Sequence, residues 1–587
     1  SSTLPCEFNR SKHYLCAPET PPATFGTLTV LGKPFPGIRS IPSIRDESWQ
    51  QVPHHTQYLL FGGMCLAPVT GPKCLQARQP YTLGVAGQSM ASRPDLHQSL
   101  DATRADRSFF GHPRGLATLF FTEMWERFSY YGMRALLILF MTAGVARGGL
   151  GFSYAKAGAI YGLYTGMVYL LSLPGGWVAD RITGQRRAVL YGGILIAAGQ
   201  FCLVAPSTMA FYLGLVLLVM GTGLLKPNVS TIVGQLYAPG DGRRDAAFSI
   251  FYMGINLGAL ISPFACGWVG EKVGWRLGFG LAGVGMIAGL IQYTLGGKYL
   301  GVAGLHPAIP DNPAADHRQK RRVALAAAGA LAVLGILGAL AATGAIAFTA
   351  ELISDALGVA LVLLSVAIFS WLLLGRGWSA EERKRSAAIL VLFLSSAVFW
   401  FAFEQAGSSL NLFAEGSVDR WVHGYQFPAS WYQLVQPFFI ITLAPVFAWL
   451  WVRLGKREPS SPAKFAFGLF FVSAGFILLV PVAGGQAVSP FWLIGTYFLH
   501  TLGELSLSPV GLSAMTKLAP TRVVGMMMGL WFVSTGAGNY LGGRMASLYG
   551  SMTIPTLFAI TAAIAMAAAI AMVILLKPTV RLMSGVK

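Results

Sequence analysis

The chain has 587 residues, of which 54% are hydrophobic and only 11% carry a charged side chain. An ordinary soluble protein carries roughly 25% charged residues, so this composition excludes a soluble enzyme of this size. The formal net charge is +19. Basic loops of a membrane protein account for that charge better than a nucleic-acid groove does, because no basic stretch is interleaved with aromatic residues. We therefore expect a multi-spanning membrane protein that binds no nucleic acid.

The first hundred residues differ from the rest of the chain. They are polar and rich in Pro, Ser, Thr and Gln, and their apolar fragment 58–61 is far too short to cross a bilayer. No basic segment leads into an apolar core with a small-residue cleavage site, so we expect no signal peptide. Met90 opens a plausible start. We interpret 1–100 as an N-terminal extension without function, either spurious as far as residue 89 or a disordered tail.

Apolar segments of transmembrane length follow one another from about Leu116 onward. They predict an all-α, polytopic fold of about 14 spans: a six-helix bundle, an inserted pair of helices and a second six-helix bundle. The expected divisions are 110–300 for the N-terminal bundle, 301–380 for a linker with the two extra helices, and 385–587 for the C-terminal bundle. The predicted spans are 116–143, 154–178, 187–205, 209–236, 247–268, 275–297, 323–348, 352–375, 387–414, 430–453, 464–483, 488–515, 523–546 and 553–576.

Basic residues gather in alternate loops between these spans. Arg186 and Arg187 follow the second span, Arg243 and Arg244 follow the fourth, and a further cluster lies at 318–322. Under the positive-inside rule these loops are cytoplasmic, and both termini lie on the same side. Two six-helix bundles with a site between them are a common transporter plan, although a channel or a membrane enzyme could share the number of spans.

Charged residues lie inside the first predicted span. A helix places six residues of this span on one face over about 16 Å, at i, i+3, i+4, i+7, i+8 and i+11: Glu123, Glu126, Arg127, Tyr130, Tyr131 and Arg134. Each charge at the bilayer centre costs at least about 2.5–3.5 kcal/mol on insertion scales. We therefore expect this stripe to face water or charged partners. The alternatives are an interfacial segment with snorkelling ends, or a purely structural network of ion pairs.

Isolated polar groups occur in four other spans. These are Lys226, Asn256, Glu404 and Glu504. Together with the stripe they supply three cations and four carboxylates, which leaves a carboxylate able to hold a proton, as in a proton relay. A static pair that locks two helices together is the alternative for each group taken singly. No nucleophile–base arrangement and no metal-ligand spacing is visible, so we expect neither an enzyme nor a metal site.

Several motifs carry a resemblance to known transporters. Segment 180–187, Asp-Arg-x-x-Gly-x-Arg-Arg, resembles a loop of the major facilitator superfamily. Segment 123–131, Glu-x-x-Glu-Arg-Phe-x-Tyr-Tyr, resembles the hallmark of the proton-dependent oligopeptide transporter (POT) family, and 251–258, Phe-Tyr-x-x-Ile-Asn-x-Gly, is similar to its fifth-helix signature. An inserted helix pair is typical of the bacterial members. The resemblance covers about 110–577.

The resemblance implies a function that the composition alone does not. It implies a proton-coupled symporter that imports di- and tripeptides by alternating access, as a monomer, across the bacterial cytoplasmic (inner) membrane with both termini cytoplasmic. The proton gradient would drive it, and no cofactor is expected. The alternatives are a proton-coupled transporter of another small solute, such as a drug, an amino acid or nitrate, and a peptide sensor that binds without transport.

The resemblance also implies which residues bind the peptide. The peptide carboxylate would meet Arg127, Tyr131 and Lys226, with Tyr169, rather than Tyr161 or Tyr164, lining the same pocket. The peptide amino group would meet Asn256 and Glu504, and Trp531 would shape a side-chain pocket. The eighth helix of the family commonly reads Gln-Ser-x-Asn-Pro, whereas 433–437 reads Gln-Leu-Val-Gln-Pro. Gln436 therefore presents its amide near the amino group with one additional methylene.

Proton coupling and gating are implied at a second set of residues. Arg134 and Glu404 would form an extracellular gate between the bundles, with Glu404 as a protonation site. Glu123 and Glu126 would couple the proton to the peptide through Lys226. Animal members use a histidine in the second span, where this chain has none, so the carboxylates would carry the proton alone.

Overall fold

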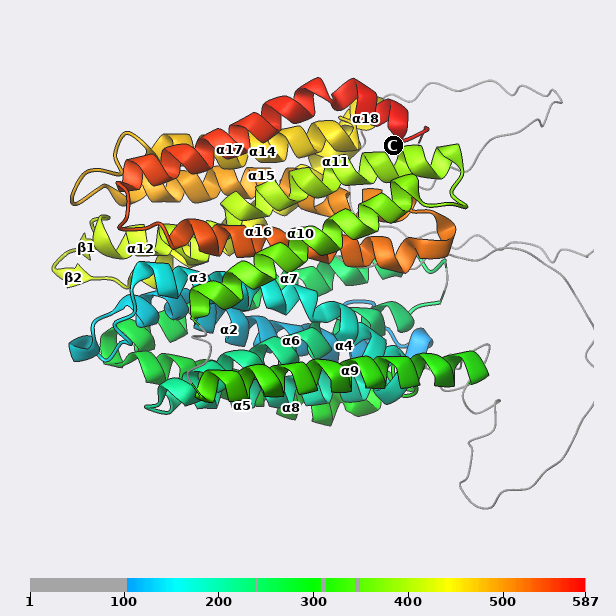
Figure 1. Cartoon of the computed structure of the whole chain (residues 1–587), viewed down its shortest axis with the longest axis horizontal. Coiled ribbons are helices and arrows are strands. Elements are labelled where there is room, and N and C mark those ends of the chain that lie inside the picture. Colours follow the sequence, from blue (N-terminus) through cyan, green and yellow to red (C-terminus); the bar gives the residue numbers. More distant parts are fainter. Residues whose placement is uncertain (1–102, 239, 308–312, 344–348, 586–587) are drawn as a thin grey trace, which may run out of the picture. The chain divides into compact units, whose positions relative to one another are not determined.

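Long helices make up most of the chain that the computed structural model describes, which comprises residues 103–238, 240–307, 313–343 and 349–585 (Figure 1). The predicted N-terminal extension lies outside these described residues. Most helices follow the predicted apolar segments closely, although the helices that begin at Pro313 and Ala380 start ten and seven residues earlier than predicted. The predicted all-α fold is confirmed. The helices are α2 (Arg114–Thr142), α3 (Tyr154–Leu170), α4 (Ser172–Val178), α5 (Gln185–Val204), α6 (Thr208–Gln235), α7 (Arg243–Trp268), α8 (Trp275–Gly296), α9 (Pro313–Ala342), α10 (Ala350–Leu374), α11 (Ala380–Phe403), α12 (Ser409–Gly416), α13 (Val435–Leu454), α14 (Ser461–Leu479), α15 (Pro490–Leu518), α16 (Val524–Ala546), α17 (Ile554–Ile574) and α18 (Leu576–Leu582).

Side-chain caps explain where several of these helices begin. The Ser153 hydroxyl accepts a hydrogen bond from the Lys156 amide at the start of α3, and Ser379 and Glu382 form a reciprocal capping box at the start of α11. Such caps satisfy amide groups that the first helical turn leaves without partners. The helix starts are therefore encoded locally, at polar residues that flank apolar segments.

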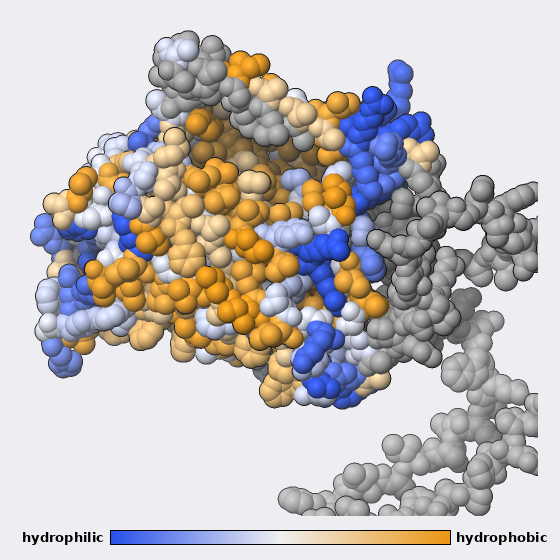
Figure 2. All heavy atoms as spheres, turned by 90° about the horizontal axis from the view of Figure 1, so that it is seen from below, coloured by the Kyte–Doolittle hydropathy of each residue, from blue (hydrophilic) through white to orange (hydrophobic). Residues whose placement is uncertain are grey.

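Nine helices in the described ranges are long and apolar enough to cross a membrane. α2 departs from this pattern because four charged side chains lie in its interior, besides Arg114 at its first position. Figure 2 shows apolar residues in a broad band across one face of the molecule, with hydrophilic residues toward both ends. An apolar band between two polar ends is the surface expected of a membrane-spanning helical protein.

Two predicted spans are divided in the structure: 154–178 forms α3 and α4 on either side of Leu171, and 387–414 is broken more sharply. The segment 387–414 was expected to be a single helix, but α11 ends at Phe403 and a 3₁₀ turn, η5 (Glu404–Gly407), precedes α12. The interruption falls at Ser408, whose φ of −129° and ψ of −96° are not helical. A break of this kind leaves backbone carbonyls near Glu404 without their helical partners, so they can accept hydrogen bonds from other elements.

Helices pack both against their neighbours in the sequence and against helices several elements away. α5 packs against α6 and α8, and α2 against α7 and α8, while α14 packs against α15 and α17. All the described helices belong to one compact unit. The finer division into 110–300, 301–380 and 385–587 stays a prediction.

Small residues connect α3 to α16. A Cβ atom added to Gly158 would overlap Ser547, one added to Gly543 would overlap the backbone of Gly162, and Gly166 lies against Gly536. Glycine at such points lets helix backbones approach closely within a membrane. α3 and α16 therefore form a direct backbone contact between the first and last parts of the described chain.

We expect Gly543→Ala to destabilise this contact. The new methyl group would overlap the Cα and N atoms of Gly162, which cannot move independently of their helix. Overpacking of this kind costs about 1–3 kcal/mol. The midpoint of thermal unfolding in detergent should therefore fall, whereas Gly416→Ala, where no neighbouring atom lies within 4 Å, should leave it unchanged. Equal midpoints for the two variants would contradict the packing of α3 against α16.

Candidate functional site

The charged stripe of α2 forms a buried ion-pair group. Arg127 Nε lies 2.9 Å from Glu123 Oε1 and 2.7 Å from Glu126 Oε2. The exposed fractions of the three residues are 3% or less. Within the described chain, Arg127 Nη2 and Glu123 Oε2 make no hydrogen bond. Glu126 Oε1 also makes no hydrogen bond there, so the group is paired internally and still has a donor and carboxylate acceptors with which to bind a polar ligand.

Lys226 of α6 lies close to this group without joining it. Its ammonium nitrogen is 4.0 Å from the centroid of the Tyr169 ring, a cation–π contact between α6 and α3. It interacts electrostatically with Arg127, Glu126 and Glu123, yet no carboxylate of the described chain lies within ion-pair distance of it. The structure thus brings together the four residues implied for the peptide carboxylate, since Tyr131 and Tyr169 also interact electrostatically with Arg127.

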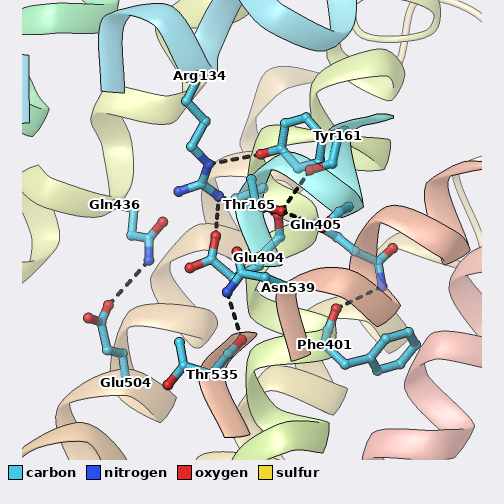
Figure 3. A network of polar contacts seen from close by, with 12 residues as sticks. Arg134, Tyr161, Thr165, Phe401, Glu404, Gln405, Gln436, Glu504, Thr535 and Asn539 are labelled. Carbon is cyan, nitrogen blue, oxygen red and sulfur yellow. Dashed lines mark hydrogen bonds and ion pairs between the residues drawn. The ribbon is translucent and has the colours of Figure 1, made fainter. Parts of the chain in front are cut away.

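Arg134 of α2 is paired with Glu404, beyond the end of α11 (Figure 3). Arg134 Nη2 lies 2.5 Å from Glu404 Oε2 and also donates to the Glu404 backbone carbonyl at 3.3 Å. The carbonyl is available because the α-helix ends at Phe403 and Glu404 begins the 3₁₀ turn η5. Both side chains are buried, with exposed fractions of 7% and 6%. One guanidinium therefore ties α2 to η5 through side chain and backbone at once.

Glu504 lies beside this pair in Figure 3 and contacts Gln436. Gln436 Nε2 donates to Glu504 Oε2 at 3.2 Å, which joins α13 to α15. Asn256 is buried, and its amide nitrogen donates to the Tyr252 carbonyl of its own helix at 2.9 Å. Tyr252 in turn interacts electrostatically with Glu504. The structure thus pairs Gln436 with Glu504 directly, whereas the Asn256 amide donates within its own helix.

Trp531 of α16 is buried among helices of the second half. Its ring fills the space beside Gly511 of α15, where an added Cβ atom would overlap it. It also makes an edge-to-face contact with Phe465 of α14, with ring centroids 6.4 Å apart. These contacts place the indole in a wall formed by α14, α15 and α16.

Three contacting residues were not predicted from the sequence. Tyr161 of α3 accepts a hydrogen bond from Arg134 Nε at 2.9 Å, and Asn411 of α12 donates to the Ala135 carbonyl at 2.8 Å. Glu271, in the turn after α7, accepts from the Ala429 and Ser430 amides at 2.8 Å each. The sequence offered little indication of these contacts, because Asn411 and Glu271 each bind a partner more than a hundred residues away. Tyr161 is closer in sequence to Arg134 but lies on another helix.

Comparisons with known proteins give a single result. The chain matches the POT family over residues 186–563. The peptide transporter YePEPT of Yersinia enterocolitica is 41% identical over 510 residues, which cover 83% of this chain and 98% of that protein. A di-/tripeptide transporter of Lactococcus lactis is 37% identical over 503 residues, covering 84% and 100%. These relatives are transporters and not enzymes, as the sequence predicted.

The fold is also similar to solved structures. A crystal structure of a peptide transporter POT in complex with sulfate matches with a TM-score of 0.79 and 44% identity, over 83% of this chain and 99% of that one. The predicted major facilitator fold of a multi-pass membrane protein is thereby confirmed. On the family match, the relatives and the fold together, the chain belongs to the POT family.

Proposed function

We propose that the chain is a symporter that imports di- and tripeptides together with protons by alternating access. The observation that carries the proposal is the separation of charges in the buried site. Arg127 and Lys226 supply positive charge near α3 and α6, while Glu504 supplies a carboxylate on α15. A zwitterionic peptide placed between them keeps both of its charges paired while water leaves, which avoids a large desolvation cost. The similarity to named peptide transporters supports this substrate class.

Proton coupling is proposed to act through changes of ion-pair partner. Protonation of Glu404 removes the negative charge that holds Arg134, so the link between α2 and η5 weakens and the gate opens. A peptide carboxylate that binds Lys226 weakens the attraction between Lys226 and Glu123 or Glu126, which leaves a carboxylate free to exchange a proton. Each substrate then favours one of two conformations, as coupling between two ligands requires.

The membrane supplies the driving force in this proposal. We propose the bacterial cytoplasmic membrane as its location, with both termini cytoplasmic, a monomer as the working unit and no cofactor. Moving one proton through 100 mV supplies about 2.3 kcal/mol. Each pH unit adds about 1.4 kcal/mol. Either contribution alone is sufficient to accumulate a peptide roughly tenfold or more.

Uptake of labelled dialanine into proteoliposomes tests this function. With an acidic exterior, dialanine should accumulate, an uncoupler should abolish the accumulation, and unlabelled di- and tripeptides should compete while alanine and nitrate should not. Competition by one of those solutes, and not by dipeptides, would replace the peptide with another substrate. Binding of dialanine without flux would contradict transport and indicate a sensor.

Glu504→Gln should weaken binding of the peptide amino group. The variant retains the shape that Gln436 contacts but loses the negative charge. A buried, hydrogen-bonded charge pair that loses one partner costs about 2–5 kcal/mol, so affinity for dialanine should fall about 30-fold or more. N-acetyldialanine, which has no amino charge, should bind the wild type and the variant equally in isothermal titration. An equal loss for both ligands would exclude Glu504 as the partner of the amino group.

A further inference from the structure

The guanidinium of Arg134 has a partner that does not belong to Glu404. Its Nε atom donates to the Tyr161 hydroxyl at 2.9 Å, while Nη2 faces both the carboxylate and the backbone carbonyl of Glu404 (Figure 3). Tyr161 comes from α3 and is 1% exposed. Arg134 therefore has one charged partner, the Glu404 carboxylate, which protonation can neutralise. Its other two acceptors, the Tyr161 hydroxyl and the Glu404 carbonyl, are neutral and stay available after protonation.

Gly407 leaves the space in which this arrangement fits. A Cβ atom at Gly407 would overlap the Tyr161 hydroxyl and would lie 2.6 Å from Arg134 Nε. Both neighbours are ends of side chains, but their mutual hydrogen bond and burial hold them in place. A larger residue at position 407 would thus separate the hydroxyl from the guanidinium before it disturbed other contacts.

We propose that Tyr161 is a positioning residue of the proton-sensitive gate, and that Gly407 provides the space that Tyr161 needs. The proposal rests on the proposed function, in which Glu404 takes up the coupled proton. A buried cation that loses its anionic partner is costly unless other groups hydrogen bond to it. Tyr161 supplies such a bond, so it stabilises Arg134 more after proton uptake than before it. It thereby makes proton uptake possible at a higher pH.

Several other titratable or charged groups lie around Glu404, and each of them contributes to the pH dependence of uptake. They reach it from the elements packed around it, and all of them except the Tyr161 hydroxyl remain present in every variant below. They are Arg134, Tyr130 and Tyr131 of α2, Tyr161 and Tyr169 of α3, Lys226 of α6, and Glu504 of α15.

Tyr161→Phe removes the hydroxyl and keeps the ring. A hydrogen bond to a charged group contributes about tenfold or more to an equilibrium, so the external pH for half-maximal dialanine uptake should fall by about one unit. Counterflow exchange, which needs no net proton movement, should be preserved. Tyr164→Phe is the matched control, because Tyr164 is also buried on α3 and its hydroxyl makes no hydrogen bond within the described chain. Equal loss of uptake at every pH, with no shift, would overturn the positioning role.

Gly407→Ala is a second, independent way to remove the hydrogen bond between Tyr161 and Arg134. It should shift the pH profile in the same direction as Tyr161→Phe, because the methyl group displaces the hydroxyl from Arg134. In the double variant the shift should be smaller than the sum of the two single shifts, since both changes remove one hydrogen bond. Additive shifts would show that Gly407 acts elsewhere and would overturn its assignment.

A distance measurement without peptide separates this inference from the proposed function. Arg147 follows α2 and Glu415 lies on α12, which follows η5, and their Nη1 and Oε1 atoms are 3.3 Å apart. Spin labels at these positions, in a background with the six native cysteines replaced, report opening. The pH at half-opening should fall by about one unit in Tyr161→Phe and stay unchanged in Tyr164→Phe. Unshifted opening in both would overturn the inference, whereas lack of dialanine uptake by the wild type would overturn only the proposed function.

Discussion

Glu404→Gln should abolish proton-driven accumulation of dialanine and leave counterflow exchange in place. The glutamine amide keeps the size of the carboxyl group but cannot cycle between a charged and a neutral form. Its Arg134 contact, 2.5 Å in the wild type, is then permanently without the negative charge. Labelled dialanine should equilibrate across the liposome membrane, so the accumulation ratio should fall from roughly tenfold or more to about one.

Glu415→Gln is the matched control for this experiment. Glu415 lies on α12, close to Glu404 in the sequence, and pairs with the exposed Arg147. Exposed pairs contribute about 0–1 kcal/mol, so its loss should change accumulation little. Full proton-driven accumulation by Glu404→Gln would contradict the assignment of Glu404 as a site of the coupled proton.

Lys226→Gln should reduce the affinity for dialanine by about tenfold at the least and by up to about 10⁵-fold. Its ammonium group lies over the Tyr169 ring and has no carboxylate of the described chain within ion-pair distance, so it can accept a new anionic partner. A close, buried charge pair across an interface is coupled by about 1.5–7 kcal/mol. The loss should be measured by isothermal titration at equilibrium, because Lys226 is also proposed to act in proton coupling.

A change of ligand provides the control for Lys226. Dialanine amide lacks the carboxylate, so it should bind the wild type weakly and bind Lys226→Gln with the same affinity. The affinities of the two ligands for the two proteins then give the coupling free energy between the peptide carboxylate and the Lys226 ammonium group. If the variant still preferred dialanine to its amide by the wild-type factor, Lys226 would not contact the peptide carboxylate.

The helices could be predicted from the sequence because the bilayer allows few alternatives. About 20 apolar residues in succession can satisfy their backbone groups within a membrane only as a helix. Most predicted segments are helices with small shifts at their ends, and the largest shift is at α9, which begins ten residues early. The break after Glu404 could not be predicted from 387–414 alone. It depends on donors from other helices, Arg134 to the Glu404 carbonyl and Tyr497 to the Ala406 carbonyl.

The site was predictable where it lies along one helix and less so where helices meet. The spacing of Glu123, Glu126 and Arg127 places them on one face of α2, and the structure pairs all three. Tyr161 could not be chosen over Tyr164 in the same way. Both are buried on α3, and only the position of Arg134 on a neighbouring helix decides which hydroxyl has a partner. Lys226 lies over Tyr169 for the same reason, since the position of that ring depends on how α3 packs against α6.

The most direct measurement of the central claim, that proton and peptide cross together, is proton movement driven by peptide alone. Proteoliposomes with a pH-sensitive dye in the lumen, without an imposed pH gradient, receive dialanine outside. Wild-type protein should acidify the lumen in proportion to the dialanine gradient, and Glu404→Gln should not. Entry of dialanine into wild-type liposomes without any change in lumenal pH would contradict the account.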